Sequence, residues 1–204
     1  MIGNDVVDLA HPGVQPGARH VRFDARVFAR PERDALAASG APDRLRWMLW
    51  AAKEAAYKVV KKLDGATVWS PRRFEVSLDA NLAGFVTHGS HKVPVWVEED
   101  GAHIHAVASS APLNADAQRW QVGQLAVGAD ESLAVRALAT AGLAELLGHE
   151  PGALSFERDG RIPVLCIDGV PAGVDLSLSH HGRFIAWAAD LRGGELAEAV
   201  GGQA

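Results

Sequence analysis

Cysteine is nearly absent from this sequence of 204 residues, in which Cys166 is the only one. A disulfide framework and a cysteine-based zinc site are therefore excluded, and we expect a reducing, cytoplasmic setting. No apolar run approaches the roughly 20 residues that a membrane-spanning helix needs. The first nine residues contain two acids and no basic segment, so we do not expect a secretory signal peptide. These absences leave a globular protein with a hydrophobic core of its own.

Charge is distributed unevenly along the chain. The formal net charge is −5, which argues against a general nucleic-acid binder. Residues 1–75 nevertheless hold 13 Lys and Arg against 9 Asp and Glu, a net charge of +4, whereas the remainder holds 7 against 16, or −9. A basic front half in an acidic protein predicts an anionic ligand or partner at one face. The alternative is that these basic residues only coat one pair of helices.

Two parts of the chain follow the same pattern. A helix-like run at 45–63 and another at 133–147 each precede several short alternating strands that end in a small-residue strand. We therefore predict an α+β fold with two similar halves, each a helix with an antiparallel sheet, related by a pseudo-twofold axis. The predicted domains are 1–112 and 113–204, joined by a linker rich in small and polar residues. The alternative is chance similarity between two amphipathic patterns.

The helix predicted at 45–63 has two distinct faces. Glu54 and Lys58 share one of them. In the second half, Asp130 can cap the start of the predicted helix, and Gly148 stands where a C-terminal glycine belongs. The face opposite Glu54 carries an apolar stripe with spacings of three and four: Leu45, Leu49, Ala52, Ala56, Val59 and Leu63.

Two acids and two lysines are candidates for chemistry. The strand predicted at 2–9 carries Asp5, and the first long helix carries Lys53, Glu54 and Lys58. Two carboxylates from separate elements, with ammonium groups nearby, suit a magnesium-bound phosphate, because Mg²⁺ takes a few hard oxygen ligands and keeps positions open for phosphate. For Glu54 and Lys58 alone, the alternative is a helix surface pair worth about 0.2–0.5 kcal/mol.

A second candidate group lies at the end of a predicted strand near the C-terminus. Ser179 and His180 close the apolar run VDLSLS and precede Gly182. A histidine at a strand end beside a glycine can reach an anion or exchange a proton, and the alternative is a simple turn residue. Neither a hydrolase nucleophile elbow nor a phosphate-binding loop accompanies it.

Three segments of the chain resemble the signatures of the 4′-phosphopantetheinyl transferase superfamily. Residues 3–9 (GNDVVDL), 50–58 (WAAKEAAYK) and 176–182 (LSLSHHG) are similar to the family forms G-x-D-[IV], W-x-x-K-E-[AS]-x-x-K and S-[LI]-S-H-[ST]. Residues 160–163 (GRIP) resemble its G-[KR]-P form, and residues 26–32 (RVFARPE) its R-x-[FL]-x-x-x-E segment. Each motif is weak alone, whereas three in one short chain are a strong signal.

The order of these segments is informative within that resemblance. In the single-domain holo-acyl-carrier-protein synthases the aspartate motif comes first and the Ser-His motif last, as it does here. The chain length instead resembles the two-domain surfactin-synthetase-activating type, in which the Ser-His half comes first. The resemblance therefore implies a two-domain transferase with its halves exchanged in sequence, which we expect to be a monomeric pseudo-dimer with one cleft.

The resemblance implies a metal and phosphate site in the first half. Asp5 and Glu54 would hold Mg²⁺ on the pyrophosphate of coenzyme A, which is the substrate. Lys53 and Lys58 would contact the phosphates or the leaving group. Glu54 would also accept the proton of the attacking serine, directly or through a water on the metal. The implied catalytic residues are thus Glu54, Lys58 and Asp5.

The second half is expected to hold the rest of the coenzyme. Ser179 and His180 would bind the nucleotide end, and Arg161 matches a basic position that often meets the 3′-phosphate. The two-domain type commonly has a second acid two residues after the first, but here Asp8 follows one residue later. Whether Asp8 is a third metal ligand stays open, because a regular strand turns its side chain away from the first acid.

The implied reaction moves the 4′-phosphopantetheine arm of coenzyme A to a serine of an acyl or peptidyl carrier protein. We expect neither nucleic acid nor a membrane as a partner. One alternative is a protein that keeps the fold and binds coenzyme A but does not transfer it, and another is an unrelated α+β protein. Carrier proteins are usually acidic, so the basic residues of the front half are the expected docking surface: Arg22, Arg26, Lys61, Lys62, Arg72 and Arg73.

Overall fold

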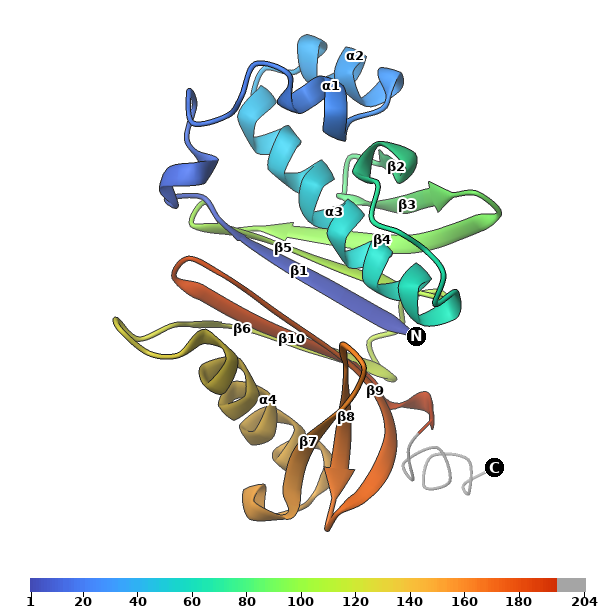
Figure 1. Ribbon diagram of the computed structural model, residues 1–204, viewed down its shortest axis with the longest axis vertical. Coiled ribbons are helices and arrows are strands. Elements are labelled where there is room, and N and C mark those ends of the chain that lie inside the picture. Colours follow the sequence, from blue (N-terminus) through green and yellow to red (C-terminus); the bar gives the residue numbers. More distant parts are fainter. Residues whose placement is uncertain (194–204) are drawn as a thin grey trace.

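The computed structural model describes residues 1–193. Over this range the chain forms two five-stranded antiparallel sheets, and each sheet carries one long helix on its outer face (Figure 1). None of the helices in this range is long and apolar enough to cross a membrane.

In the first half, the first and the last strand in chain order lie side by side in the sheet. The strand order is β1-β5-β4-β3-β2, so the first strand of the chain lies at one edge and pairs with the last strand of its half. Short helices lie between β1 and the long helix α3. The elements are β1 (Ile2–Asp8), η1 (Pro12–Val14), α1 (Phe23–Val27), α2 (Arg30–Ala38), α3 (Pro42–Leu63), η2 (Pro71–Arg73), β2 (Glu75–Leu78), β3 (Ala83–His88), β4 (His91–Glu99) and β5 (His103–Ser109).

The second half repeats this arrangement without the two short α-helices. Its sheet has the order β6-β10-β9-β8-β7, and its long helix α4 follows the edge strand β6. The elements are β6 (Gln118–Gln124), α4 (Glu131–Leu147), η3 (Pro151–Ala153), β7 (Leu154–Asp159), β8 (Ile162–Ile167), β9 (Val170–His181), β10 (Phe184–Asp190) and η4 (Leu191–Gly193).

The two halves therefore correspond element by element. In each, an edge strand leads to a helix and then to a four-strand meander whose last strand returns beside the first. This confirms the predicted α+β fold with two similar halves. The proposed domain boundary at residue 112 falls in the connection between β5 and β6, and each sheet keeps to its own side of it.

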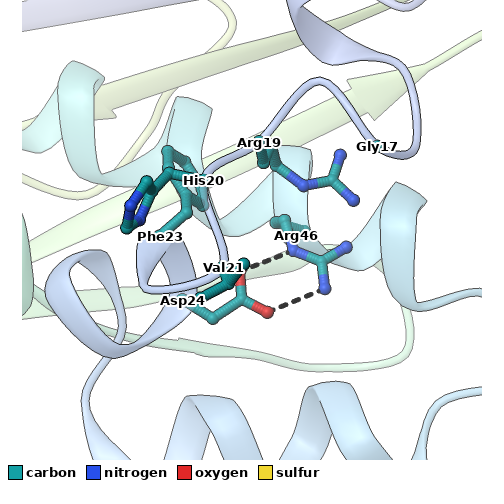
Figure 2. A pocket seen from close by; sticks show the side chains of 7 residues that line it. All are labelled: Gly17, Arg19, His20, Val21, Phe23, Asp24 and Arg46. Carbon is teal, nitrogen blue, oxygen red and sulfur yellow. Dashed lines mark hydrogen bonds and ion pairs between the residues drawn. The ribbon is translucent and has the colours of Figure 1, made fainter.

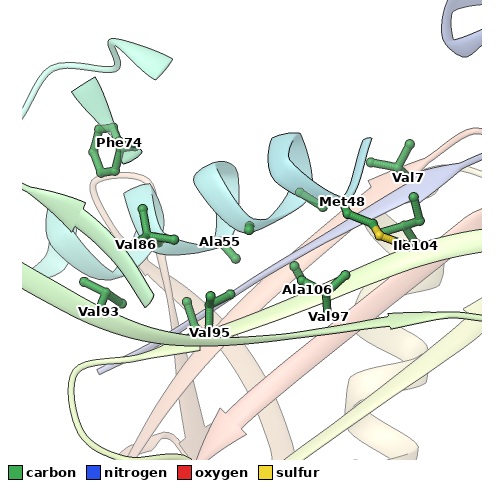
Figure 3. Close-up of a cluster of buried hydrophobic side chains, with 14 of the residues drawn as sticks. Val7, Met48, Ala55, Phe74, Val86, Val93, Val95, Val97, Ile104 and Ala106 are labelled. Atoms are coloured by element: carbon green, nitrogen blue, oxygen red, sulfur yellow. The ribbon is translucent and has the colours of Figure 1, made fainter. Parts of the chain in front are cut away.

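The core of the first half lies between α3 and its sheet. Figure 3 shows Ala55 and Met48 of α3 above Val95, Ile104 and other strand residues. Burying a Val, Leu or Ile side chain contributes about 1.5–3 kcal/mol, so this layer is a major source of stability. A second core lies between α4 and the sheet of the second half, where Leu143 and Trp187 are buried.

The inner faces of the two sheets pack against each other. Ile2 and Val107 of the first half contact Ala188 of the second, and Val6 contacts Phe184. The result is a four-layer molecule in the order α3, first sheet, second sheet, α4 (Figure 1). Because these contacts are apolar and buried, they fix how the two halves meet.

The patterns in the sequence locate both long helices. Asp130 Oδ1 accepts the Leu133 amide at 2.8 Å, and Gly148 adopts a left-handed conformation with φ 70°, which confirms both predicted ends of α4. The buried side of α3 differs from the predicted stripe, because Leu63 at its end is 47% exposed. Two charged residues outside the stripe are buried: Lys53 under α2 and η2, and Arg46 against Asp24 of α1.

Candidate functional site

The site begins with a close approach between β1 and α3. Gly3 faces the helix so tightly that a Cβ atom there would overlap the carbonyl oxygen of Ala55. A residue without a side chain is therefore needed where the strand crosses the helix. This approach brings Asp5, the next residue of β1 on the side that faces α3, to the face of α3 that carries Lys58.

Asp5, Glu54 and Lys58 come together between these two elements. The ammonium of Lys58 lies 3.6 Å from Oδ1 of Asp5 and donates a hydrogen bond of 2.6 Å to the carbonyl of Asn4. The Asp5 and Lys58 side chains are 17% and 29% exposed, so solvent still reaches them. Three predicted site residues thus lie together, one from the motif on β1 and two from the motif on α3.

Burial destabilises the charged form of both carboxylates. Burial raises the pKa of Asp5 to about 6, although Lys58 opposes that shift. Burial also raises the pKa of Glu54 to about 7, and the negative charge of Asp5 adds to the effect while Lys58 opposes it. One ammonium is therefore too little positive charge for two partly buried carboxylates.

This donor set fits a magnesium ion. Asp5 and Glu54 supply hard oxygen ligands with a deficit of positive charge around them. Within residues 1–193, no group of three or more His, Cys, Asp and Glu side chains is arranged to hold a metal. Two carboxylates suit Mg²⁺, which usually keeps several waters and takes its other ligands from substrate phosphates.

Lys53 is not part of this site, and its predicted contact with the phosphates is wrong. Its ammonium lies 2.7 Å from Oε1 of Glu32 and donates to the carbonyls of Pro71 and Phe74. The Lys53 side chain is fully buried. Burial lowers the pKa of Lys53, and the charge of Glu32 opposes the shift. Successive residues of a helix point about 100° apart, so Lys53 faces α2 and η2 whereas Glu54 faces β1.

A seam of polar contacts joins the edge strand β1 to β9 in the second half. One edge of β1 pairs with β5, so its alternate amides on the other edge need partners elsewhere. Side chains of β9 accept hydrogen bonds from these amides, and the positions on the two strands advance in the same direction. Ile2, Asn4 and Asp8 donate to Asp175 Oδ2, Ser177 Oγ and His181 Nδ1, and each pair is separated by 173 residues.

Ser179 belongs to this seam. Its Oγ accepts a 3.0 Å hydrogen bond from the Asn4 side chain, and the residue is 5% exposed. The hydroxyl therefore joins the two halves, and its role at the nucleotide end stays a prediction. Neighbouring residues of a strand point to opposite faces, so His180 lies on the other side of the sheet. There, its Nδ1 lies 2.8 Å from Oε2 of Glu131.

Asp8 lies at the far end of the seam from Ile2. Its carboxylate accepts from the Arg183 backbone amide, Nε and Nη2 at 2.9, 2.9 and 2.7 Å, and from the Ala10 amide at 2.9 Å. These contacts hold the pKa of Asp8 well below its usual range, against the effect of burial. Asp8 is thus a bridge between the halves and not a ligand beside Asp5. Gly182, with φ 57°, makes the turn that lets Arg183 approach.

The other predicted ligand of the nucleotide stands apart from these contacts. Arg161 is exposed and follows Gly160 in the turn between β7 and β8. Its role stays a prediction.

The pseudo-twofold axis does not generate a second site of this kind. Each edge strand pairs over seven residues with the last strand of its half, starting at Ile2 in β1 and at Gln118 in β6. Asp5 is the fourth residue of the first pairing and Gln121 is the fourth of the second, so Gln121 takes the place of Asp5. An amide there lacks the negative charge of a metal ligand. Gln121 lines a pocket with Glu98 and Trp120, whose Nε1 donates to Glu98 at 3.2 Å.

A further pocket lies beside the first turns of α3 (Figure 2). Arg46 donates through Nε and Nη2 to Asp24 at 2.8 and 2.9 Å, as the dashed lines show. The guanidinium is thus already paired, and the pocket contains none of the residues predicted to bind coenzyme A.

Sequence reasoning missed Lys62, Asp175 and Arg183. Lys62 is expected on the docking surface, but its side chain is 6% exposed and pairs with Asp175 at 2.9 Å. This part of the docking prediction is wrong. The spacing of Asp175, Ser177 and His181, two and four residues apart along one strand face, is the signal that could have found the seam.

Comparison with known proteins addresses the first half. A family model described as ACPS, 4′-phosphopantetheinyl transferase superfamily, matches residues 1–112. The match includes Asp5, Glu54 and Lys58, and it ends before β9. The comparison with curated proteins found no match.

Proposed function

Because the chain belongs to the 4′-phosphopantetheinyl transferase superfamily, we propose that it moves the phosphopantetheine arm of coenzyme A to a carrier-protein serine in a Mg²⁺-dependent reaction. One observation carries this proposal. Asp5 on β1 and Glu54 and Lys58 on α3 form a partly buried group of two carboxylates and one ammonium, open to solvent. Such a group suits a metal-bound diphosphate better than it suits a structural ion pair.

Asp5 and Glu54 are the residues that would hold the metal. When bound, Mg²⁺ neutralises phosphate charge and stabilises the charge that develops on the leaving group. Both carboxylates come from rigid elements, and the Gly3 crossing fixes the distance between those elements. The protein thereby presents its ligands without having to order a loop.

The transfer itself requires positioning and charge more than covalent chemistry. The serine oxygen of the carrier attacks the β-phosphorus of coenzyme A, and the bond from that phosphorus to the bridging oxygen breaks. Adenosine 3′,5′-bisphosphate leaves, and the serine proton goes to Glu54. The Lys58 ammonium, held by the Asn4 carbonyl, stays beside the carboxylates and faces the phosphates.

The nucleotide end of coenzyme A is assigned to His180 and Arg161 on the strength of the family resemblance. His180 is 43% exposed at its side chain and pairs with Glu131. A phosphate that binds there has to replace this carboxylate, because the two anions would repel each other. Lys53 is left out of the binding set, since its ammonium is buried in other contacts, whereas Ser179 remains a candidate through the hydrogen that its hydroxyl can still donate.

The carrier protein is expected to dock on exposed basic residues of the first half. Arg22, Arg26, Arg72 and Arg73 are all exposed, whereas Lys62 is engaged in the seam. Attraction between this surface and an acidic carrier makes the apparent affinity fall as salt rises.

We also propose that the chain acts as a monomer. The inner face of each sheet is already covered by the other half of the same chain, as in a dimer made from one polypeptide. Size-exclusion chromatography with light scattering is expected to give the mass of one chain, and a trimer would contradict this proposal.

Mass spectrometry of an apo carrier protein tests the proposed function. The purified chain is incubated with coenzyme A and Mg²⁺, and the carrier is expected to gain one phosphopantetheine group, which removal of Mg²⁺ by EDTA abolishes. The alternative is a coenzyme A-binding protein without activity. It would show a higher melting temperature with coenzyme A and Mg²⁺ but no gain in carrier mass.

A further inference from the structure

Lys62 of α3 contacts two other elements, β1 and β9, at one buried point. It lies one helical turn after Lys58 on α3, and its ammonium donates to the carbonyls of Ile2 on β1 and Leu176 on β9 at 2.7 and 2.8 Å. It also pairs with Oδ1 of Asp175 at 2.9 Å. The second oxygen of Asp175 accepts the amide of Ile2. The pair therefore connects the helix, the edge strand and the second half.

These contacts bear on the distance between the two carboxylates. Glu54 is carried by α3 and Asp5 by β1, and these two elements meet at the site through Lys58 and through the Gly3 crossing. Lys62 lies eight residues after Glu54, about 12 Å along the helix, so it does not touch a bound metal. It acts through the orientation of β1, whose first residue it holds.

We propose that Lys62 and Asp175 are positioning residues for the metal site. By fixing the start of β1 against α3 and β9, they hold Asp5 at the separation from Glu54 that one divalent cation requires. This inference rests on the proposed function, because it takes Asp5 and Glu54 as the ligands. It assigns the second half a part in metal binding, although both ligands belong to the first half.

The other end of β1 does not have this role. Asp8 and Arg183 also join the halves, but their hydrogen bonds connect β1 only to the turn between β9 and β10. The helix that carries Glu54 takes no part in them. Asp5 stands three residues from each end of the strand, and of these two polar contacts between the halves only the one at Lys62 also engages α3.

The test measures metal affinity directly, with Mn²⁺ as the probe. Carboxylate sites that suit Mg²⁺ also suit Mn²⁺, and the electron paramagnetic resonance signal of free Mn²⁺ gives the bound fraction without any turnover. Glu54→Gln defines the part of the binding that belongs to this site. We expect Lys62→Met and Asp175→Asn each to raise the Kd for Mn²⁺ by about 10-fold or more, as loss of supporting groups around metal ligands typically does.

A matched variant separates positioning from plain stability. Arg46→Met removes two ion pairs of a similarly buried cation, with Asp24 and Asp43, and both pairs lie within the first half and away from the seam. It is expected to lower the melting temperature while leaving the Kd for Mn²⁺ unchanged. All measurements are made well below the melting temperature of each variant.

The outcomes decide the inference. It is overturned when the folded Lys62→Met and Asp175→Asn variants bind Mn²⁺ as tightly as the unchanged chain. Should Lys62→Met fail to fold, Asp175→Asn decides alone, because its amide oxygen can still accept from Ile2. An unchanged chain without a Glu54-dependent Mn²⁺ site overturns both this inference and the metal site of the proposed function. A chain whose Mn²⁺ affinity depends on Lys62 and Asp175 as expected, but which transfers nothing, contradicts only the proposed function.

Discussion

Gly3 and the carbonyl oxygen of Ala55 are in such close contact that no side chain fits between them. The strand that carries Asp5 and the helix that carries Glu54 and Lys58 therefore cross with no room for a side chain at this point. This explains in physical terms why a glycine precedes the aspartate in the first motif.

Gly3→Ala tests this relationship. The added methyl group has to push β1 away from α3, which we expect to cost about 1–3 kcal/mol of unfolding free energy. The rate of transfer is expected to fall by more than the loss of folded protein explains, because Asp5 moves with the strand. Urea unfolding and initial rates measure the two effects. Gly40→Ala, where a Cβ meets nothing within 4 Å, is the control. A Gly3→Ala variant with normal stability and rate would show that the crossing is not tight.

A substitution at Lys53 tests whether this residue stabilises the fold through Glu32 or contacts the phosphates. Lys53→Met leaves the buried carboxylate of Glu32 without its countercharge, which we expect to cost about 3–5 kcal/mol of unfolding free energy. The folded fraction is expected to keep the KM for coenzyme A. Chemical denaturation and steady-state kinetics below the melting temperature measure these quantities. Normal stability with a raised KM would return Lys53 to the phosphate site.

Lys53 and Glu54 also show where prediction from the sequence stops. The pattern of apolar residues predicts the long helix and places Glu54 on its polar face, and capping residues predict the ends of α4. Whether Lys53 meets a phosphate or a carboxylate depends on α2, whose Glu32 lies 21 residues earlier. Periodicity within one helix carries no information about a second helix that covers another side of it.

The partner of the seam face of β9 could not be predicted for a similar reason. Alternation in VDLSLSHH predicts a strand, and it places Asp175, Ser177 and Ser179 on one face. It does not reveal that this face receives the free amides of a strand 173 residues earlier. The family motif implies a ligand role for Ser179, but not the contact of its hydroxyl with Asn4.

Asp8 predicts a specific dependence of stability on pH. Its pKa in the folded chain lies below the ordinary value of 3.8, mainly because Arg183 donates to it. The unfolded chain therefore binds a proton at Asp8 more readily, so this residue stabilises the fold above about pH 4 and loses that effect as the pH falls. Unfolding free energies at pH 7, 5 and 3.5 are expected to decline less in Asp8→Asn than in the unchanged chain.

Asp34→Asn is the control for the acid prediction. Asp34 forms an exposed pair with Arg30, and its side chain is 73% exposed. Its removal is expected to leave the decline below pH 5 nearly unchanged. Equal declines in Asp8→Asn and in the unchanged chain would mean that the contact with Arg183 does not persist in solution.

The rate of phosphopantetheine transfer by Glu54→Gln tests the central claim most directly. This change keeps the shape of the side chain but removes a charge from the pair of carboxylates, so we expect the rate at saturating Mg²⁺ to fall by at least about 100-fold with little change in melting temperature. Glu145→Gln, the same substitution at an exposed position of α4, is expected to transfer normally. Transfer by Glu54→Gln at the rate of the unchanged chain would contradict the account that Asp5 and Glu54 together form the active site.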